Sequence, residues 1–421
     1  MRGSFVSDLG LNPEVWLFLS LLGCVTIFFK FSRIWSVRNL DLLLLFVLVP
    51  GMMLIVADQS NPPWFAFLWL FAGSAAWMTR CLLDLGLIRR PLLEPNLNAS
   101  GLLCLSVGIL GLLLAETLSL PVHDGALRNP AEPAGHEDLQ PSNRKEHSTD
   151  LRVTPMLGKL LPDSLKREPA QVVVSRILAV LAHSALVAAF MLIGWRTFER
   201  PIAGLSMTAC YLLLPYTRMM VVDSGQLISA ALILHAVCWS GVPSLTGALI
   251  GLAAGWIPAC LGLIPLWASF YRGRGMIRFL IVGCSVAIVC ALLGATIPEL
   301  ARWARVLGAR SIAEAGLLPW FEPTTPASFW AGIDAAFRLP VLIGYAALVI
   351  AITFWPARKS LSELIALSAA LLVASQFWYL DKGGTLVFLY LPMVILMMFR
   401  PTMTARRTVA APLQAATTTR N

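Results

Sequence analysis

The sequence predicts an all-α, polytopic membrane protein, and three observations lead to that fold class. The 421 residues are 57% hydrophobic and only 13% charged, whereas soluble domains carry roughly 25% charged residues. Apolar runs of roughly 17 to 25 residues, the length that crosses a bilayer as a helix, recur from one end of the chain to the other. Backbone polar groups must be satisfied internally in lipid, and a helix does this within one segment.

Hydropathy divides the chain into apolar segments that predict about twelve transmembrane helices. The long segments are 13–31, 40–57, 63–83, 99–119, 171–194, 201–222, 225–240, 277–297, 328–354, 361–380 and 383–399. Two further segments, 244–257 and 258–271, have about 14 residues each, below the usual crossing length. We expect them to form a broken helical hairpin, because Pro258 lacks an N–H and its ring ends the first helix. The first segment lacks a basic leader and a clear cleavage site, and is expected to be a retained helix.

Basic residues in the short loops predict the orientation of the chain, because such loops are enriched on the cytoplasmic side. The basic groups are Arg33 and Arg38, Arg89 and Arg90, Arg196 and Arg200, Arg272 to Arg278, Arg358 and Lys359, and the tail with Arg400, Arg406 and Arg407. All of these basic groups lie on one side of the membrane only if segment 244–271 returns to the side from which it enters. The N-terminus, loops 120–170 and 298–327, and the turn Leu380 to Gly384 are then external.

Several function classes have no signature in the sequence. The net charge of +9 comes mainly from short loops and the tail, so it does not indicate nucleic-acid binding. All eight cysteines fall in apolar runs without a CxxC pair, which argues against a disulfide framework and a zinc ribbon. His183 and His235 lack a metal-ligand spacing, so no metal site is predicted and both are interpreted as packed histidines. No P-loop or nucleotide-binding turn is evident.

Residues 225–278 carry the most informative pattern in the chain. The stretch contains Gly225-Gln226, Ser240-Gly241, Gly247, Gly251 and Gly255 at four-residue spacing, Pro258, Pro265, and a closing group of arginines. This order resembles the GT-C glycosyltransferases, and most closely glycosyltransferase family 87, the polyprenyl-phosphate-mannose-dependent mannosyltransferases. One departure is Ile257, which stands where the family usually has a lysine. The acidic motif of the first external loop also differs from the family pattern.

The resemblance implies a domain organisation and an activity. Residues 1–95 would be an N-terminal three-helix membrane extension, and 96–400 a GT-C-like core with a large external first loop at 120–170. The Ala/Thr-rich composition of 401–421 separately predicts a disordered cytoplasmic tail. The activity would be inverting transfer of a mannose-like sugar from a polyprenyl-phosphate donor to a glycan, lipid or protein acceptor outside the plasma (inner) membrane. The sequence indicates no cofactor. Dependence on a divalent metal stays open, because GT-C enzymes differ in this respect.

Such chemistry needs a base for the acceptor hydroxyl and cations for the lipid phosphate. Asp124, just after segment 99–119, is the first candidate for the base, and Glu116, near the end of that segment, is the second. Asp124 could equally be a solvated loop acid. Glu116 could simply reach the membrane interface. Glu137 and Asp138 are weaker candidates within a charged run.

The candidate binding residues lie at predicted external helix ends. Arg176 and Arg218 carry guanidinium groups that match phosphate geometry, although either could anchor its helix at the interface. Asp223 could orient the acceptor or neutralise Arg218, and Gln226 opens the family-like segment. Asp381 and Lys382 lie in a short turn with two glycines, and Lys382 could supply the positive charge that Ile257 does not provide. The alternative is an ordinary glycine turn with loop charges.

Two other functions fit the same sequence. A secondary transporter would share the segment count and the broken, glycine- and proline-rich hairpin. A catalytically degenerate GT-C-like scaffold would fit the absence of the family lysine.

Overall fold

The computed structural model describes residues 13–57, 62–87, 93–119, 170–219, 223–273, 275–312, 328–330, 333–380 and 383–401. Over these residues the chain is helical, with no β-strand. Within these described ranges, six helices are long and apolar enough to cross a membrane, and six shorter apolar helices of 10 to 17 residues accompany them. The all-helical, membrane-type fold is therefore confirmed, while the expected number of twelve crossings stays a prediction.

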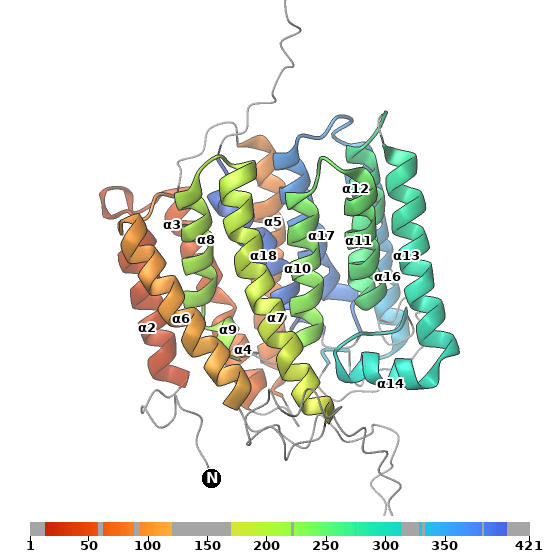
Figure 1. Cartoon of the computed structure of the whole chain (residues 1–421), viewed down its shortest axis with the longest axis horizontal. Coiled ribbons are helices and arrows are strands. Elements are labelled where there is room, and N and C mark those ends of the chain that lie inside the picture. Colours follow the sequence, from red (N-terminus) through yellow and green to blue (C-terminus); the bar gives the residue numbers. More distant parts are fainter. Residues whose placement is uncertain are drawn as a thin grey trace, which may run out of the picture.

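Most of the helices run up and down through one bundle, and α14 lies across its lower end (Figure 1). They are α2 (Pro13–Phe28), α3 (Val37–Val47), α4 (Val49–Ala57), α5 (Trp64–Leu83), α6 (Ala99–Ser119), α7 (Ala170–Leu192), α8 (Pro201–Leu213), α9 (Tyr216–Met219), α10 (Ser224–Cys238), α11 (Pro243–Trp256), α12 (Leu263–Phe270), α13 (Met276–Thr296), α14 (Pro298–Val306), α16 (Arg338–Phe354), α17 (Leu361–Trp378) and α18 (Val387–Phe399). Short turns join some of them: η1 (Phe31–Arg33), η2 (Asp84–Gly86), a π-helical turn η6 (Ile193–Thr197), η7 (Pro258–Gly262) and η8 (Ala335–Phe337).

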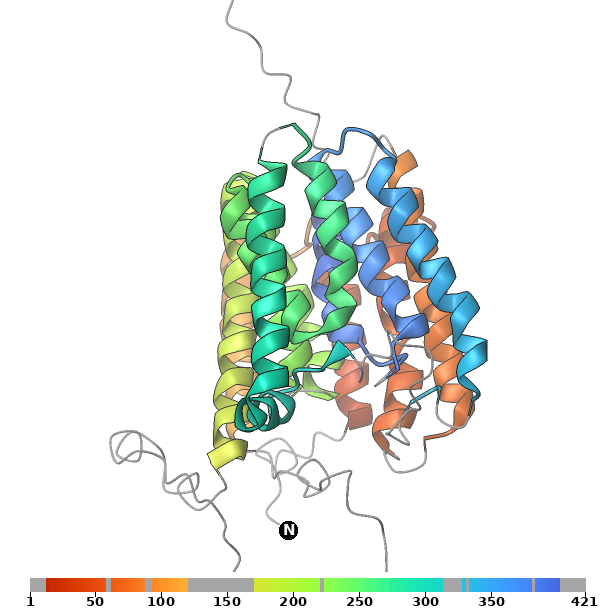
Figure 2. The same ribbon diagram turned by 90° about the vertical axis from the view of Figure 1, so that its right-hand side faces the viewer.

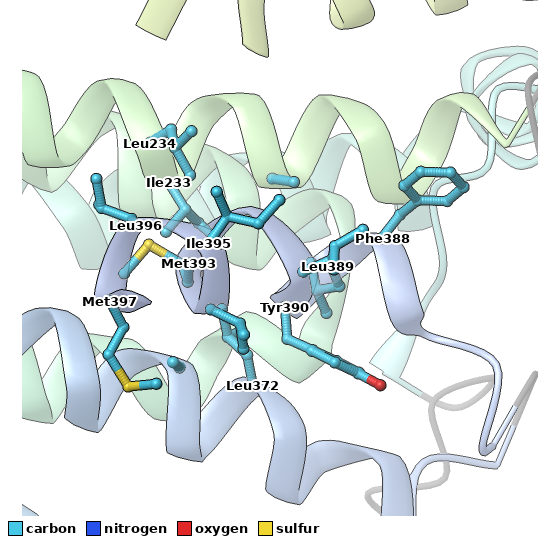
Figure 3. Close-up of a cluster of buried hydrophobic side chains, with 14 of the residues drawn as sticks. Ile233, Leu234, Leu372, Phe388, Leu389, Tyr390, Met393, Ile395, Leu396 and Met397 are labelled. Carbon is cyan, nitrogen blue, oxygen red and sulfur yellow. The ribbon is translucent and has the colours of Figure 1, made fainter. Parts of the chain in front are cut away.

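The last helix, α18, forms the centre of the bundle. All of its 13 residues are buried. Its side chains reach Ile233 and Leu234 of α10 on one side and Leu372 of α17 on another (Figure 3). The rings of Phe388 and His183 connect α18 to α7 in an edge-on contact. A helix that is apolar on every face is typical of such a central position.

Several helix boundaries differ from the sequence prediction, and proline explains two of them. Segment 40–57 begins earlier, at Val37, and divides into α3 and α4, because Pro50 has no N–H to continue the ladder. Segment 201–222 ends at Leu213, since the residue before Pro215 takes an extended conformation. The region 298–327, expected to be an external loop, begins with the helix α14.

The pair formed by α11 and α12 has the geometry expected of the broken hairpin. Ile257 is extended, and Pro258 opens the 3₁₀ turn η7 that leads into α12. The chain just before α11 and the chain just after α12 lie together, because Tyr271 Oη donates to the Ser240 carbonyl at 2.7 Å. The chain therefore leaves and returns to one end of the bundle.

The described basic loops share that same end. The connections α2–α3, α7–α8, α10–α11, α12–α13 and α16–α17 lie together at the upper end in Figure 1, and α2 begins at the lower end. Arg33, Arg196, Arg272 and Lys359 belong to these connections. A buried ion network adds to this end: Arg80 contacts Asp41 and Asp84, and Arg400 after α18 also contacts Asp84.

Glycines allow α11 and α13 to touch along their backbones, and the two helices lie side by side in Figures 1 and 2. A Cβ at Gly247 would lie 2.6 Å from the Phe279 carbonyl oxygen, and one at Gly251 would overlap Gly283. The remaining surface of α13 is mostly exposed. This close approach is the packing that small residues provide between membrane helices.

We expect Gly247→Leu to destabilise the bundle, because the added side chain forces α11 away from α13. The cost should be at least the roughly 1–3 kcal/mol typical of overpacking. Thermal unfolding in detergent should show a lower Tm for this variant than for Gly294→Leu, the matched control, whose added Cβ would meet nothing within 4 Å. Equal Tm values would contradict the role of the glycine contact.

Thiol labelling tests the shared end of the basic loops. In a background without native cysteines, Arg196→Cys and Arg272→Cys should react with a membrane-impermeant reagent only after cells are opened. Arg302→Cys on α14, at the other end of the bundle, should react in intact cells. Labelling of position 272 from outside would show that the hairpin crosses the membrane.

Candidate functional site

A buried ion pair joins two of the residues that the sequence singles out. Glu116 near the end of α6 accepts from Arg218 of α9, with Oε2 2.8 Å from Nε and 2.7 Å from Nη2. The Glu116 and Arg218 side chains are 10% and 13% exposed, respectively. Charged hydrogen bonds of this kind are among the stronger ones in proteins. The residues lie 102 positions apart in the chain, so only the fold brings them together.

The position of Arg218 follows from the break after α8. Pro215 ends that helix, and the short helix α9 begins at Tyr216. Thr217 Oγ1 donates to the Leu214 carbonyl at 2.7 Å and closes the turn. Tyr216 also donates to the carbonyl of Leu45 at 2.5 Å, which fixes α9 against α3. Arg218 is therefore held on a rigid turn rather than at the end of a long helix.

Trp16 of α2 completes this cluster, and sequence reasoning missed it. The Arg218 guanidinium carbon lies 4.2 Å from the centre of the Trp16 ring, within cation–π distance. Trp16 Nε1 is buried without a hydrogen-bond partner, and Arg218 Nη1 bonds to none of the described residues. The cluster of Trp16, Glu116 and Arg218 thus retains two donor nitrogens, Trp16 Nε1 and Arg218 Nη1. Nothing in the sequence pattern distinguishes Trp16 from the other 13 tryptophans.

Arg176, near the start of α7, lies beside the end of α6. Its Nη1 donates to the Leu118 carbonyl at 3.2 Å, and the residue is only 2% exposed. This burial places Arg176 against protein rather than among lipid headgroups. Leu118 is two residues after Glu116, so both candidate arginines contact the last turns of α6.

Asp223 and Gln226 organise the start of α10. Asp223 caps the helix by accepting from the Gln226 backbone N–H at 3.4 Å, and it accepts from Gln226 Nε2 at 2.9 Å. Gln226 Nε2 also lies 3.3 Å from the Thr385 carbonyl, just before α18. The ion-pair partner of Arg218 is Glu116, whereas the sequence offered Asp223 for that role. The geometry of Asp223 is that of an N-cap.

Of the other residues that the sequence singled out, five are not described by the structure, whereas Ile257 and His183 are buried in the bundle. Asp124, Glu137, Asp138, Asp381 and Lys382 lie outside the described residues. Ile257 is 3% exposed at the break between α11 and η7, an apolar residue in an apolar setting. His183 bonds to the Tyr211 hydroxyl at 2.8 Å. Among the described residues no group of three or more His, Cys, Asp or Glu is placed to hold a metal.

Compared with protein-family models, curated proteins and solved structures, the chain matches none of them. The site is therefore interpreted from its own geometry: an acid, two arginines and a tryptophan at the lower end of the bundle, opposite the basic loops.

A double-mutant cycle should show that Glu116 and Arg218 act as a pair. Removing one partner of a buried ion pair costs roughly 3–5 kcal/mol, because the other charge is left buried. Glu116→Gln and Arg218→Met should each lower the free energy of unfolding. The double variant should lose less than the sum, by about 1–3 kcal/mol. Strict additivity in denaturant unfolding would contradict the pair.

Proposed function

We propose that the protein is a membrane glycosyltransferase that moves a sugar, mannose-like by resemblance, from a polyprenyl-phosphate donor to an acceptor on the external face. The observation that carries the proposal is the cluster of Trp16, Glu116 and Arg218, with Arg176 nearby, at the end of the bundle opposite the basic loops. A lipid-linked sugar presents its phosphate at the membrane surface, where these helix ends would lie. We infer a multi-pass protein of the plasma (inner) membrane, in keeping with such a donor.

A positively charged arginine suits this reaction, because the leaving group is a phosphate. The acceptor hydroxyl attacks the anomeric carbon, the bond from that carbon to the phosphate oxygen breaks with inversion, and polyprenyl phosphate leaves with the electron pair. Arg218 offers Nη1 to the phosphate while Glu116 holds the opposite side of the guanidinium. Guanidinium donors that are already oriented stabilise charge that grows in the transition state. Trp16 could add its indole N–H to the same phosphate.

The hydroxyl proton passes to a carboxylate, and Asp124 and Glu116 are the two candidates. Oε2 of Glu116 already accepts two hydrogen bonds from Arg218, which suits Glu116 to orienting that arginine. We therefore favour Asp124, in the chain segment that follows α6, as the base. Asp223 and Gln226 would shape the acceptor side, and Asp381 and Lys382 remain further candidates for binding donor or acceptor.

A secondary transporter is the second candidate, and the hairpin of α11, η7 and α12 favours it. Discontinuous helices commonly form the substrate sites of transporters. In this chain, however, the candidate ionic residues lie at α6 and α9 rather than at the hairpin break, where Ile257 is apolar.

A transfer assay separates these functions. Reconstituted protein should transfer label from radiolabelled polyprenyl-phosphate mannose or glucose. Asp124→Asn should lower the rate by roughly 10²–10⁴-fold, as loss of a general base does. Arg218→Ala should lower it by about 10²–10³-fold, with Glu116→Gln showing a smaller loss.

Arg302→Ala is the matched control, since Arg302 is an exposed arginine on α14 and its loss should leave transfer unchanged. Substrate uptake into vesicles without transfer would identify a transporter. Neither activity with any acceptor pool would favour the scaffold.

A further inference from the structure

An apolar groove runs along the outside of the bundle between α7, α10 and α11, which lie next to each other in Figure 1. Its volume is about 400 Å³. One face of α10 forms its floor, with Ile228, Ala231, Leu232, His235 and Trp239 following each other at helical spacing. From residue 228 to residue 239, at about 1.5 Å per residue, the groove is roughly 16 Å long.

The walls of this groove are suited to hydrocarbon. Leu178, Leu181, Ala182 and Ala185 of α7 face Leu245 and Leu249 of α11 across it. The single imidazole, His235, bonds through Nδ1 to the Ala231 carbonyl at 2.8 Å. Since a carbonyl only accepts, Nδ1 carries the proton. His235 Nε2 and the Trp239 indole N–H are then the polar side-chain groups of a lining that is otherwise apolar, and such a lining favours a lipid chain over water.

A cation lies at the upper end of the groove, where Trp239 ends the floor. The Arg196 guanidinium carbon is 5.1 Å from the centre of the Trp239 ring. Arg196 is exposed, and it forms no ion pair within the described residues. Arg200 is exposed on the same turn, while Glu199 between them leaves a net positive charge.

The π-helical turn η6 places Arg196 over Trp239. Phe198 N–H bonds to the Ile193 carbonyl at 2.9 Å, which closes the wider turn. Gly194 packs directly against Gly204 of α8, so the corner between the helices has no room for a side chain. Such single π turns often occur at functional sites. The result is a fixed cation beside an apolar groove, near the bundle end that carries the basic loops.

We propose that this groove binds one anionic phospholipid of the leaflet that faces the basic loops. The phosphate would contact Arg196 above the Trp239 ring, and one acyl chain would lie along the face of α10. A guanidinium matches phosphate oxygens in geometry, and a cation near a membrane surface favours anionic headgroups. This site lies at the end of the bundle opposite the Glu116–Arg218 pair, so it does not depend on the proposed transferase activity.

Native mass spectrometry of the full chain tests the proposal. The protein is released from nanodiscs that contain equal amounts of phosphatidylglycerol and phosphatidylcholine. The amount of bound phosphatidylglycerol should exceed that of bound phosphatidylcholine about fivefold, because one basic residue near a membrane surface provides a preference of that size for an anionic lipid. Arg196→Ala should remove this preference, and Arg196→Lys should retain part of it. Arg302→Ala, on the other end of the bundle, is the matched control and should behave as wild type.

A second variant addresses the acyl chain. Leu232→Trp fills the groove and should reduce retention of both lipids while leaving size-exclusion behaviour unchanged. If Leu232→Trp misfolds, a phosphatidylglycerol with a photoreactive acyl chain should label peptides of α7 and α10 in wild type. The proposal is overturned if wild type retains both lipids equally, if Arg196→Ala retains as much phosphatidylglycerol as Arg302→Ala, or if label appears only elsewhere.

Discussion

The enclosure of α18 is the constraint on which the rest of the structure depends. A helix with every residue buried must be surrounded by other helices, and α17, α10 and α8 pack against it directly. In lipid this arrangement gains little from the hydrophobic effect, so close packing between side chains must stabilise it. Both ends of α18 are also tied by polar contacts. Gln226 reaches Thr385 just before the helix, and Arg400 just after it contacts Asp84.

This central helix explains why N-terminal and C-terminal segments share one core. Phe28 of α2 meets Phe399 in an edge-on ring contact with centroids 5.5 Å apart. Arg80 and Asp84, at the end of α5 and in η2, form the ion network with Arg400. The α2 helix also supplies Trp16 to the cluster around Arg218. Although the boundary predicted at residue 95 stays untested, residues on both sides of it contact each other at both ends of the bundle.

Much of the fold could be predicted from the sequence because it depends on local rules. Apolar runs predicted helices, Pro258 predicted the break after α11, and loop arginines predicted which connections share an end. The site was harder, because its contacts join residues far apart in the chain. Local reasoning placed Arg218 near Asp223, five positions away, yet the partner that neutralises it is Glu116 on another helix. Trp16 carried no signal at all, since one tryptophan in an apolar run looks like any other.

The Glu116–Arg218 pair and the ion network at the opposite end of the bundle differ in arrangement, and the difference bears on function. A buried ion pair is often no more stabilising than apolar side chains of the same size, so its presence requires another reason. In the network of Asp41, Arg80, Asp84 and Arg400, two acids balance two bases between helices that are otherwise apolar, which can fix how those helices align. The Glu116–Arg218 pair differs in being one acid and one base, and it lies beside the Trp16 ring at the other end of the bundle. Arg218 Nη1 and Trp16 Nε1 have no partner among the described residues, and an anionic group bound at this end of the bundle would accept charge-assisted hydrogen bonds from Arg218.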